Sequence, residues 1–363
     1  MEGDAKSLIK IWSLAIISLC YCYYIVSKIP KGVFRLFSLL PVFYLFVIIP
    51  LEFVSLHLIA LSTFFFTWLG TFKLLLFSFD QGPLSPLPSQ FSTFICLACF
   101  PIKPGQNSNI ARGSQLYENT KSNQKSNKRA CRHKSLTVAC VPKPLNVAIK
   151  ATLLLICFIS YNFKHLMHHH VILFIYCVHL YLELEIVLAV SVIPVRALTR
   201  FELEPQFDEP YLSTSLQEFW GHRWNLMATN ILRPFVYHPI RNLFKGLIGL
   251  TLASLIAVLA AFGVSGLMHE VLFFYLTRVN PTGEAMCFFI LHGACVAVEV
   301  AIKKMVKDKW RLHPNISAGL TFGFVIVTAI WLFYPPIGRS NVAENSIKEF
   351  SIWLDILIDK LSN

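Results

Sequence analysis

A histidine and a glutamate stand side by side within the apolar stretch from Gly246 to Thr277, which is otherwise uncharged. Ionisable side chains are costly at bilayer depth, so His269 and Glu270 mark a candidate functional site. A histidine is suited to general base chemistry because its pKa lies near physiological pH. In a chamber that holds little water, His269 is therefore suited to take a proton from a hydroxyl group.

A second group of candidate residues lies upstream, in the sequence Phe219-Trp-Gly-His-Arg-Trp-Asn225. Thr214 or Ser215 is expected to cap a helix here, with Glu218 in the matching capping position. Tryptophan prefers the boundary between membrane and water, so the two tryptophans predict a helix that lies on the membrane surface. The surrounding residues 196–245 are amphipathic and are expected to be interfacial as a whole.

This motif and the intramembrane His269–Glu270 pair together resemble the membrane-bound O-acyltransferase superfamily, and within it the plant wax synthases and their sterol-acyltransferase relatives. The plant enzymes usually carry two arginines before Trp-Asn, whereas this chain has His222 at the first of these positions. The basic stretch from Lys103 to Lys143 is the least family-like part. The resemblance covers most of the chain and includes the shorter stretches Leu8–Trp12, Phe72–Phe77, Tyr181–Glu185, Glu204–Phe207 and Pro210–Tyr211.

The resemblance implies an acyl-CoA-dependent acyltransferase that makes wax esters from long-chain alcohols and releases coenzyme A. It gives His269 the role of catalytic base and Asn225 that of the second catalytic residue. The Asn225 amide would donate to the thioester oxygen or seat the acyl group. Fatty acyl-CoA and the alcohol would be substrates, membrane lipids would surround the protein, and no cofactor or metal is expected. The expected substrate-binding residues are Trp220, Arg223, Trp224, Glu270 and His292.

These substrate-binding residues have different expected tasks. The two tryptophans and Arg223 would shape the coenzyme A entrance, where the guanidinium would meet a phosphate or an anionic lipid. Glu270 points about 100° away from His269 on a helix, which favours an orienting or structural role. His292 shares a helical face with Glu299, and packing within the protein is the favoured alternative for it.

The composition predicts an all-α, polytopic membrane protein. Of the 363 residues, 55% are hydrophobic and 14% are charged, and the mean hydropathy is +0.58. Soluble proteins carry nearer a quarter charged residues. Apolar runs of about 20 residues predict roughly seven to nine membrane-spanning helices, which form one domain over residues 1–363 around a catalytic chamber. The runs are Ile11–Ser27, Leu36–Pro50, Phe53–Phe79, Leu145–Phe163, Val171–Val195, Gly246–Thr277, Met286–Ile302 and Ile316–Tyr334.

The run from Gly246 to Thr277 is longer than a straight helix needs to cross an apolar core of roughly 30 Å. We expect a kink at Gly263, Ser265 or Gly266, immediately before His269. Backbone groups freed by a kink are tolerated where they line a cavity. The expected break therefore predicts a polar chamber beside the histidine.

Other polar residues and short apolar segments have expected places of their own. Lys73 lies near the end of its apolar run and is expected to reach the interface. Glu183 and Glu185 are two residues apart and point to different faces of a helix, so one would face a polar chamber or pair with a basic group. The island Phe91–Phe100 is too short to cross and is expected to dip into the interface, and the tail Ile347–Leu361 to lie on the membrane.

Positive charge is concentrated in one loop. The chain has a net charge of +12, and the stretch from Lys103 to Lys150 holds ten Lys and Arg residues against one acid, Glu118. Residues 80–144 are therefore expected to form a basic, partly disordered loop on the cytoplasmic side. Binding to nucleic acid is not expected, because Tyr117 is the one aromatic residue interleaved with these charges.

Neither a metal site nor a disulfide is predicted. Cys96 and Cys99 have the spacing of a ligand pair but lack a second pair of the same kind. Most of the other cysteines lie in apolar runs, where they behave as small hydrophobic residues. The histidines of residues 165–170 lack the aspartate of the His-His-x-x-x-Asp acyltransferase motif, and we interpret them as an interfacial turn.

Three alternative functions stay open at this level. The first is an acyltransferase that uses the same chemistry but transfers the acyl group to the hydroxyl of a sterol. The second is a transporter in which His269 and Glu270 relay protons or bind a solute, although no repeated halves are visible. The third is a lipid-binding membrane protein without catalytic activity. In each case the chain would be a multi-pass protein, with the endoplasmic reticulum as its expected membrane.

We predict that the basic loops Lys103–Lys143 and Lys303–Arg311 both face the cytosol, because loops rich in Lys and Arg are retained on that side. Single cysteines introduced into either loop should react with a bilayer-impermeant reagent in sealed microsomes. Protection of one loop from the reagent would contradict this topology.

Overall fold

The computed structural model describes residues 2–101, 143–199, 205–306 and 312–362, which form helices joined by short connections, with no strand among them. Eight helical runs in these residues are long and apolar enough to cross a membrane, which agrees with the predicted range and confirms an all-α, multi-pass architecture. The runs are Ser7–Lys28, Val33–Glu52, Leu56–Ser78, Asn146–Leu166, His169–Ser191, Leu226–Thr277, Glu284–Met305 and Pro314–Phe333.

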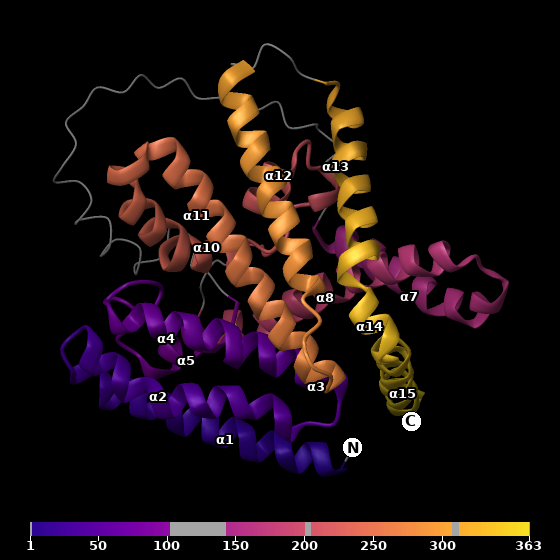
Figure 1. The fold of residues 1–363 in the computed structure, drawn as a ribbon. Helices are drawn as coiled ribbons and strands as arrows, with labels where there is room; N and C mark the ends of the chain where they lie inside the picture. Colours follow the sequence, from indigo (N-terminus) through magenta and orange to yellow (C-terminus); the bar gives the residue numbers. More distant parts are fainter. Residues whose placement is uncertain (1, 102–142, 200–204, 307–311, 363) are drawn as a thin grey trace.

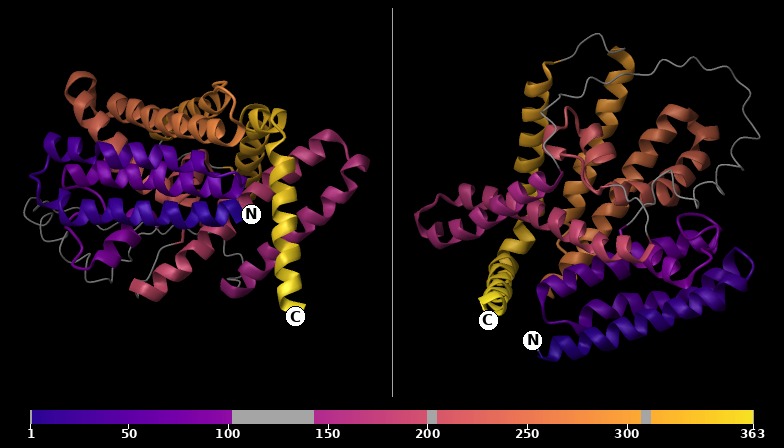
Figure 2. Two further views of the ribbon diagram at one scale, coloured as in Figure 1. Left: turned by 90° about the horizontal axis from the view of Figure 1, so that it is seen from below. Right: turned by 180° about the vertical axis from the view of Figure 1, so that it is seen from behind.

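The N-terminal helices lie side by side in one layer (Figures 1 and 2). A π-helical segment, η3 (Thr63–Gly70), joins α3 and α4 into one continuous helix. The core of the layer contains the fully buried Phe46 and Phe94. Its helices and 3₁₀ turns are α1 (Glu2–Tyr24), η1 (Val26–Lys28), α2 (Val33–Ile48), η2 (Ile49–Glu52), α3 (Leu56–Ser62), α4 (Thr71–Ser78) and α5 (Phe91–Cys99).

Two segments of this layer differ from the expectation. The island Phe91–Phe100 forms α5, and its buried Phe94 makes it part of the packed layer rather than an interfacial loop. Lys73 does not reach toward the interface, because its side chain is fully buried. Its Nζ donates to the carbonyl oxygens of Leu97 at 2.7 Å and Phe100 at 2.6 Å. The last carbonyls of a helix lack partners within it, and this ammonium group supplies donors at the end of α5.

The remaining helices build the other side of the molecule. Figure 2 shows α7 and α8 as a hairpin that extends outward, while α11 and α12 pack along each other. The C-terminal α15 contacts α7, where Phe350 stacks on Phe158 at 4.3 Å between ring centroids. The elements are α7 (Lys143–Ser160), η4 (Tyr161–Leu166), α8 (His169–Thr199), η5 (Pro210–Leu212), α9 (Leu216–Glu218), η6 (Phe219–Arg223), α10 (Leu226–Leu232), η7 (Arg233–Tyr237), α11 (His238–Thr277), α12 (Glu284–Val306), α13 (Pro314–Thr328), η8 (Ala329–Phe333), α14 (Pro335–Arg339) and α15 (Val342–Ser362).

The outer surface is suited to lipid. Large apolar side chains are exposed on it, among them Phe34, Val54 and Leu247. Four of the eight apolar runs lie between the two basic loops, an even number, as the predicted topology requires. Residues 102–142 and 307–311, which make up most of these loops, lie outside the described residues, and their side of the membrane stays a prediction.

The break in α11 lies at Gly249 and not beside His269, so the expected kink was wrong in its position. Gly249 has a φ of +81°, whereas residues 263–266 keep helical backbone angles. Small residues serve close helix packing at that point instead. A Cβ atom on Gly266 would lie 2.8 Å from Met286 Sδ and 3.1 Å from Met286 Cα. The close approach of α11 and α12 therefore replaces the predicted kink as the feature beside His269.

We predict that Gly266→Ala lowers the thermal stability, although alanine favours a helix interior over glycine by about 1 kcal/mol. The new methyl group would overlap Met286, whose backbone cannot move without shifting α12. Gly263→Ala is the matched control, because its Cβ would meet Ile290 Cδ1 at an ordinary contact distance of 3.6 Å. The unfolding midpoint in detergent, followed by size-exclusion chromatography, should fall only for the first variant. Equal midpoints would show that this helix contact tolerates added volume.

Candidate active site

A cavity of about 870 Å³ lies between α3, α8, α11, α12, α15 and the segment that carries the motif. Its volume is in the range of small-molecule binding sites, and most of its wall is apolar. Each π-helical segment of the described chain contributes to this wall, through Trp68 of η3, His222 of η6, Arg233 of η7 and Phe333 of η8. Such segments often occur at functional sites. We call this cavity the chamber.

His269 lines the chamber from α11, and its hydrogen bond decides which ring nitrogen is available as a base. Nδ1 lies 2.8 Å from the carbonyl oxygen of Ser265, one turn earlier. A carbonyl oxygen only accepts, so Nδ1 carries the ring proton and Nε2 keeps its lone pair. The ring packs on Phe289 at 4.4 Å, Phe333 at 5.5 Å and Trp68 at 6.4 Å between centroids. The helix carbonyl therefore satisfies one nitrogen and leaves the other for chemistry.

Asn225 lines the same chamber from the start of α10. Its φ of +38° lies in the left-handed region, which asparagine tolerates better than most residues. Oδ1 accepts from the backbone N–H of Ala228 at 3.2 Å and so caps α10. The amide NH₂ group is then the donor that a ligand can use. The structure thus brings Asn225 and His269 into the wall of one cavity.

The motif does not form a continuous surface helix. Ser215 caps α9 as expected, because its Oγ accepts from the Glu218 N–H at 3.2 Å. The α-helix ends there, and η6 follows with its wider turn. Trp220 and Trp224 both line the chamber, and Phe219 is buried. The aromatic side chains therefore pack into the fold rather than outward, while the position of the segment relative to the membrane stays a prediction.

His292 lies behind the chamber wall and not in it, contrary to the expected substrate contact. It is fully buried on α12, and its Nδ1 accepts from the Trp220 indole N–H at 3.0 Å. Because an indole only donates, Nε2 carries the ring proton and donates to Thr328 Oγ1 at 2.8 Å. His292 therefore holds Trp220 in place. Glu299 shares this face of α12, as predicted, and accepts from the backbone N–H of Gln217 at 3.2 Å.

Glu270 also faces away from the chamber. Its side chain is buried, and Oε1 accepts from the backbone N–H of Met286 at 2.9 Å. Met286 lies in the first turn of α12, where the N–H groups lack helical partners and the helix dipole favours a negative charge. The structure supports the structural role that its direction on the helix suggested, and it does not support a contact with substrate.

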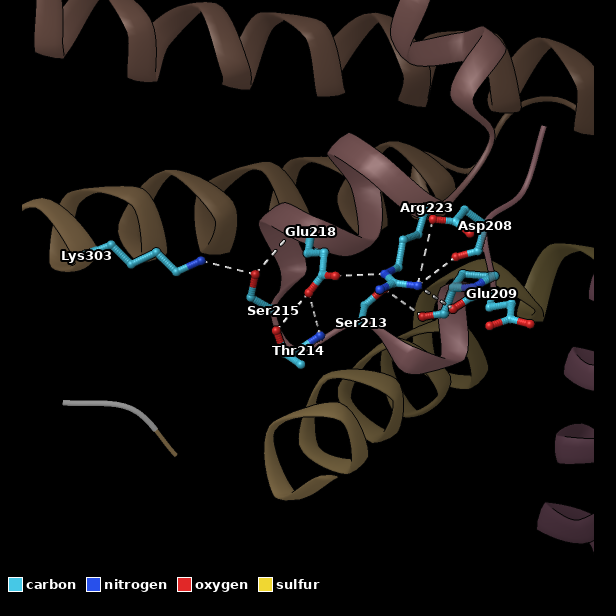
Figure 3. A network of polar contacts seen from close by, with 9 residues as sticks. Asp208, Glu209, Ser213, Thr214, Ser215, Glu218, Arg223 and Lys303 are labelled. Atoms are coloured by element: carbon cyan, nitrogen blue, oxygen red, sulfur yellow. Dashed lines mark hydrogen bonds and ion pairs between the residues drawn. The ribbon is translucent and has the colours of Figure 1, made fainter. Parts of the chain in front are cut away.

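Arg223 is held within the protein, as Figure 3 shows. Its Nε donates to Glu218 Oε1 at 2.8 Å, and its Nη1 donates to the carbonyl oxygen of Asp208 at 3.0 Å. The side chain is 15% exposed and does not line the chamber. These contacts do not support the expected role of Arg223 as a phosphate ligand.

A second polar cluster lies at the chamber wall, and of its members the sequence pointed only to Glu183. Glu183 Oε1 lies 2.9 Å from His57 Nε2, and Oε2 lies 3.4 Å from His179 Nε2. Glu349 of α15 contacts His57 Nδ1 at 3.2 Å. These contacts link α3, α8 and α15. The spacing of His179 and Glu183, one turn apart on a helix, is the signal that would have identified part of the cluster.

Glu185 points to another face of α8, as its spacing from Glu183 predicted. It pairs with Lys150 of α7. Both glutamates therefore have basic partners, and Glu183 also faces the chamber. The described residues hold no group of His, Cys, Asp and Glu that is arranged for a metal ion.

The rim of the chamber is cationic. Arg233 and Lys304 line it, together with His222 and His238, and all four residues are exposed. Among the residues that line the chamber, the one carboxylate is that of Glu183, which the two histidines of its cluster already engage. An anionic group of a ligand would therefore meet positive charge at this rim, with no carboxylate but that of Glu183 among the residues that line the chamber.

This chain is similar to known O-acyltransferases. Residues 203–291, which include the motif and His269, match the membrane bound O-acyl transferase family. The chain is 45% identical to probable long-chain-alcohol O-fatty-acyltransferase 3 of Arabidopsis thaliana, over 99% of this chain and 98% of that protein. It is 42% identical to acyl-CoA–sterol O-acyltransferase 1 of the same species, over 95% of this chain and 94% of that protein. The similarity thus extends far beyond the matched segment.

We predict that His292→Gln preserves the support of Trp220, whereas His292→Phe removes it. Glutamine can accept from the indole N–H and donate to Thr328, but phenylalanine leaves both groups unpaired. An unpaired buried polar group costs about 1–3 kcal/mol, so the phenylalanine variant should unfold at a lower temperature in detergent. Its near-ultraviolet circular dichroism should also change, because aromatic side chains lose fixed positions. Identical spectra and midpoints for the two variants would contradict this role.

Proposed function

The chain belongs to the long-chain-alcohol O-fatty-acyltransferases of the membrane bound O-acyl transferase family, and we propose that it esterifies a long-chain alcohol with the fatty acyl group of acyl-CoA. The products are a wax ester and free coenzyme A. The observation that carries this proposal is the chamber, where His269, with Nε2 available as a base, and the Asn225 amide lie in one apolar wall.

His269 acts as the general base in this scheme. Its Nε2 takes the hydroxyl proton while the alcohol oxygen attacks the carbonyl carbon of the thioester. The Asn225 amide donates to the carbonyl oxygen as negative charge develops there. The carbon–sulfur bond then breaks, and the proton passes from His269 to the departing thiolate. The base returns to its starting state, and the scheme uses no cofactor or metal.

The aromatic surroundings of His269 favour transfer to an alcohol over hydrolysis. Phe289, Phe333 and Trp68 pack around the imidazole ring and occupy space that water would otherwise fill. Exclusion of water strengthens the hydrogen bond from Asn225 and removes the competing nucleophile. A long apolar wall also suits two substrates that both carry hydrocarbon chains.

The cationic rim supports acyl-CoA as the donor. Coenzyme A carries its phosphate groups far from the thioester, so phosphates at the rim would leave the acyl group inside the chamber. Arg233 and Lys304 supply the charge-assisted hydrogen bonds that phosphates prefer. We therefore assign phosphate binding to these residues in place of Arg223.

A sterol is the second candidate acceptor, and the similarity to a sterol O-acyltransferase over almost the whole chain favours it. The same base and the same donor would serve both acceptors. The chain is an acyltransferase and a multi-pass membrane protein, so the transporter and the non-catalytic protein are set aside. We propose the endoplasmic reticulum as its membrane, with acyl-CoA supplied from the cytosol.

The acceptor is identified by competition. Purified protein receives labelled acyl-CoA with a long-chain alcohol and a sterol together, and the labelled esters are separated and measured. The alcohol is expected to give the main product. Predominant sterol ester would select the second candidate, and absence of both esters would refute the proposed function.

We predict that His269→Ala reduces ester synthesis by a factor of about 10² to 10⁴, the usual contribution of a general base. Binding of acyl-CoA should persist, because the base acts on the alcohol. Asn225→Ala should also lower turnover, and His292→Ala should have a milder effect because it acts only through Trp220. All variants are assayed at equal amounts of folded protein. Retention of activity in His269→Ala with its loss in His292→Ala would move the base to α12.

A further inference from the structure

We propose that Arg223 is a positioning residue, an internal strut that holds Asn225 in its catalytic conformation. This inference rests on the proposed function, because it assigns a task to the motif around the second catalytic residue. It also gives a role to residues 206–209, of which Gln206 and Phe207 belong to the family-like stretch Glu204–Phe207. Two sets of contacts support it: the backbone hydrogen bonds on both sides of Asn225, and the hydrogen bonds made by the guanidinium group of Arg223.

The backbone of Asn225 is fixed from both sides by one short segment. The N–H of Asp208 donates to the carbonyl oxygen of Arg223 at 2.9 Å, and the N–H of Leu226 donates to the carbonyl oxygen of Gln206 at 2.9 Å. These two bonds bracket the residue that has the left-handed φ of +38°. A conformation of this kind persists only where the surroundings determine it. Residues 206–208 are therefore the support on which the position of Asn225 depends.

Arg223 joins this support to the other end of η6. Its Nε donates to Glu218 Oε1 at 2.8 Å, while its Nη1 donates to the carbonyl oxygens of Asp208 at 3.0 Å and Glu209 at 3.5 Å. One planar guanidinium group thus spans the start of η6 and the supporting segment (Figure 3). A lysine carries the same charge but lacks the planar fork, so it cannot make both sets of bonds.

Glu218 is itself held in place, which makes the strut rigid. Its Oε2 accepts from the Thr214 N–H at 2.9 Å and from Thr214 Oγ1 at 2.7 Å. Burial raises the pKa of Glu218, but the hydrogen bonds from Thr214 and Arg223 outweigh it and keep the pKa below its ordinary value. The carboxylate is therefore ionised at neutral pH. Ser215 beside it accepts from Lys303 at 3.1 Å, which ties the network to α12 (Figure 3).

The test compares Arg223 with Arg233, which lies at the chamber rim. Arg223→Gln and Arg223→Lys should both lower kcat by about tenfold to a hundredfold, the effect of a small displacement of a catalytic group. Their KM for acyl-CoA should stay near the wild-type value. Arg233→Gln should instead raise the KM for acyl-CoA. Each enzyme is also assayed with acyl-pantetheine, which lacks every phosphate of coenzyme A.

The donor without phosphates separates the two roles. If Arg223 is a strut, its variants lose the same factor in kcat with both donors. If Arg223 binds phosphate, the defect appears as a higher KM, is relieved in the lysine variant and vanishes with acyl-pantetheine, and the proposal is overturned. Wild-type kcat in the Arg223 variants would overturn it as well.

Folding of the variants and ester synthesis by the wild-type protein are checked in separate control experiments. Size-exclusion profiles and acyl-CoA binding show whether each variant is folded. Should Arg223→Gln fail to fold, Glu218→Gln carries the same test, because it weakens the other end of the strut and should lower kcat without raising KM. A wild-type protein that makes no ester would refute the proposed function, whereas an active wild type with unaffected Arg223 and Glu218 variants would refute only the strut.

Discussion

A polar group inside this apolar fold is costly unless it finds a partner within the protein, because lipid offers none. Lys73 supplies donors to the end of α5, and Glu270 accepts from the first turn of α12. His292 uses one nitrogen for Trp220 and the other for Thr328. His269 departs from this pattern, since Ser265 engages Nδ1 and Nε2 keeps its lone pair beside the chamber. The satisfied groups fix the walls, and the open nitrogen is where we propose that the chemistry takes place.

The number and the approximate positions of the apolar helices could be predicted from composition, because a bilayer demands about 20 apolar residues for each crossing. The packing of these helices against one another could not be predicted in this way. The glycines before His269 predicted a kink in the helix. In the structure, the missing side chain of Gly266 instead leaves room for Met286, which packs against it. The π-helical turns that line the chamber have no characteristic hydrophobic periodicity by which a sequence would reveal them. The buried position of Lys73 was also not predictable, because it depends on how α5 packs against α4.

The candidate site was predictable where an ionisable residue stands out from its surroundings, as His269 and Glu270 do in an otherwise uncharged apolar segment. His269 and Asn225 share the chamber with both tryptophans of the motif. The direction of a charged side chain was not predictable, because a sequence does not show whether Arg223 meets a ligand or Glu218. The rim residues Arg233 and Lys304 lie in separate basic segments, and only the fold brings them into the lining of one cavity.

One helix, α12, sets the relation between the two halves of the site. Phe289 lies against His269, and His292 three residues later holds Trp220 of the motif. Lys303, further along, donates to Ser215, which caps α9 just before the motif, and its neighbour Lys304 lines the rim. The imidazole of His269 on α11 and the amide of Asn225 on a short connecting segment would otherwise be free to move apart. Because a helix is stiff over this length, the spacing of His269, Asn225 and the cationic rim is determined by α12 rather than by the flexibility of the motif segment.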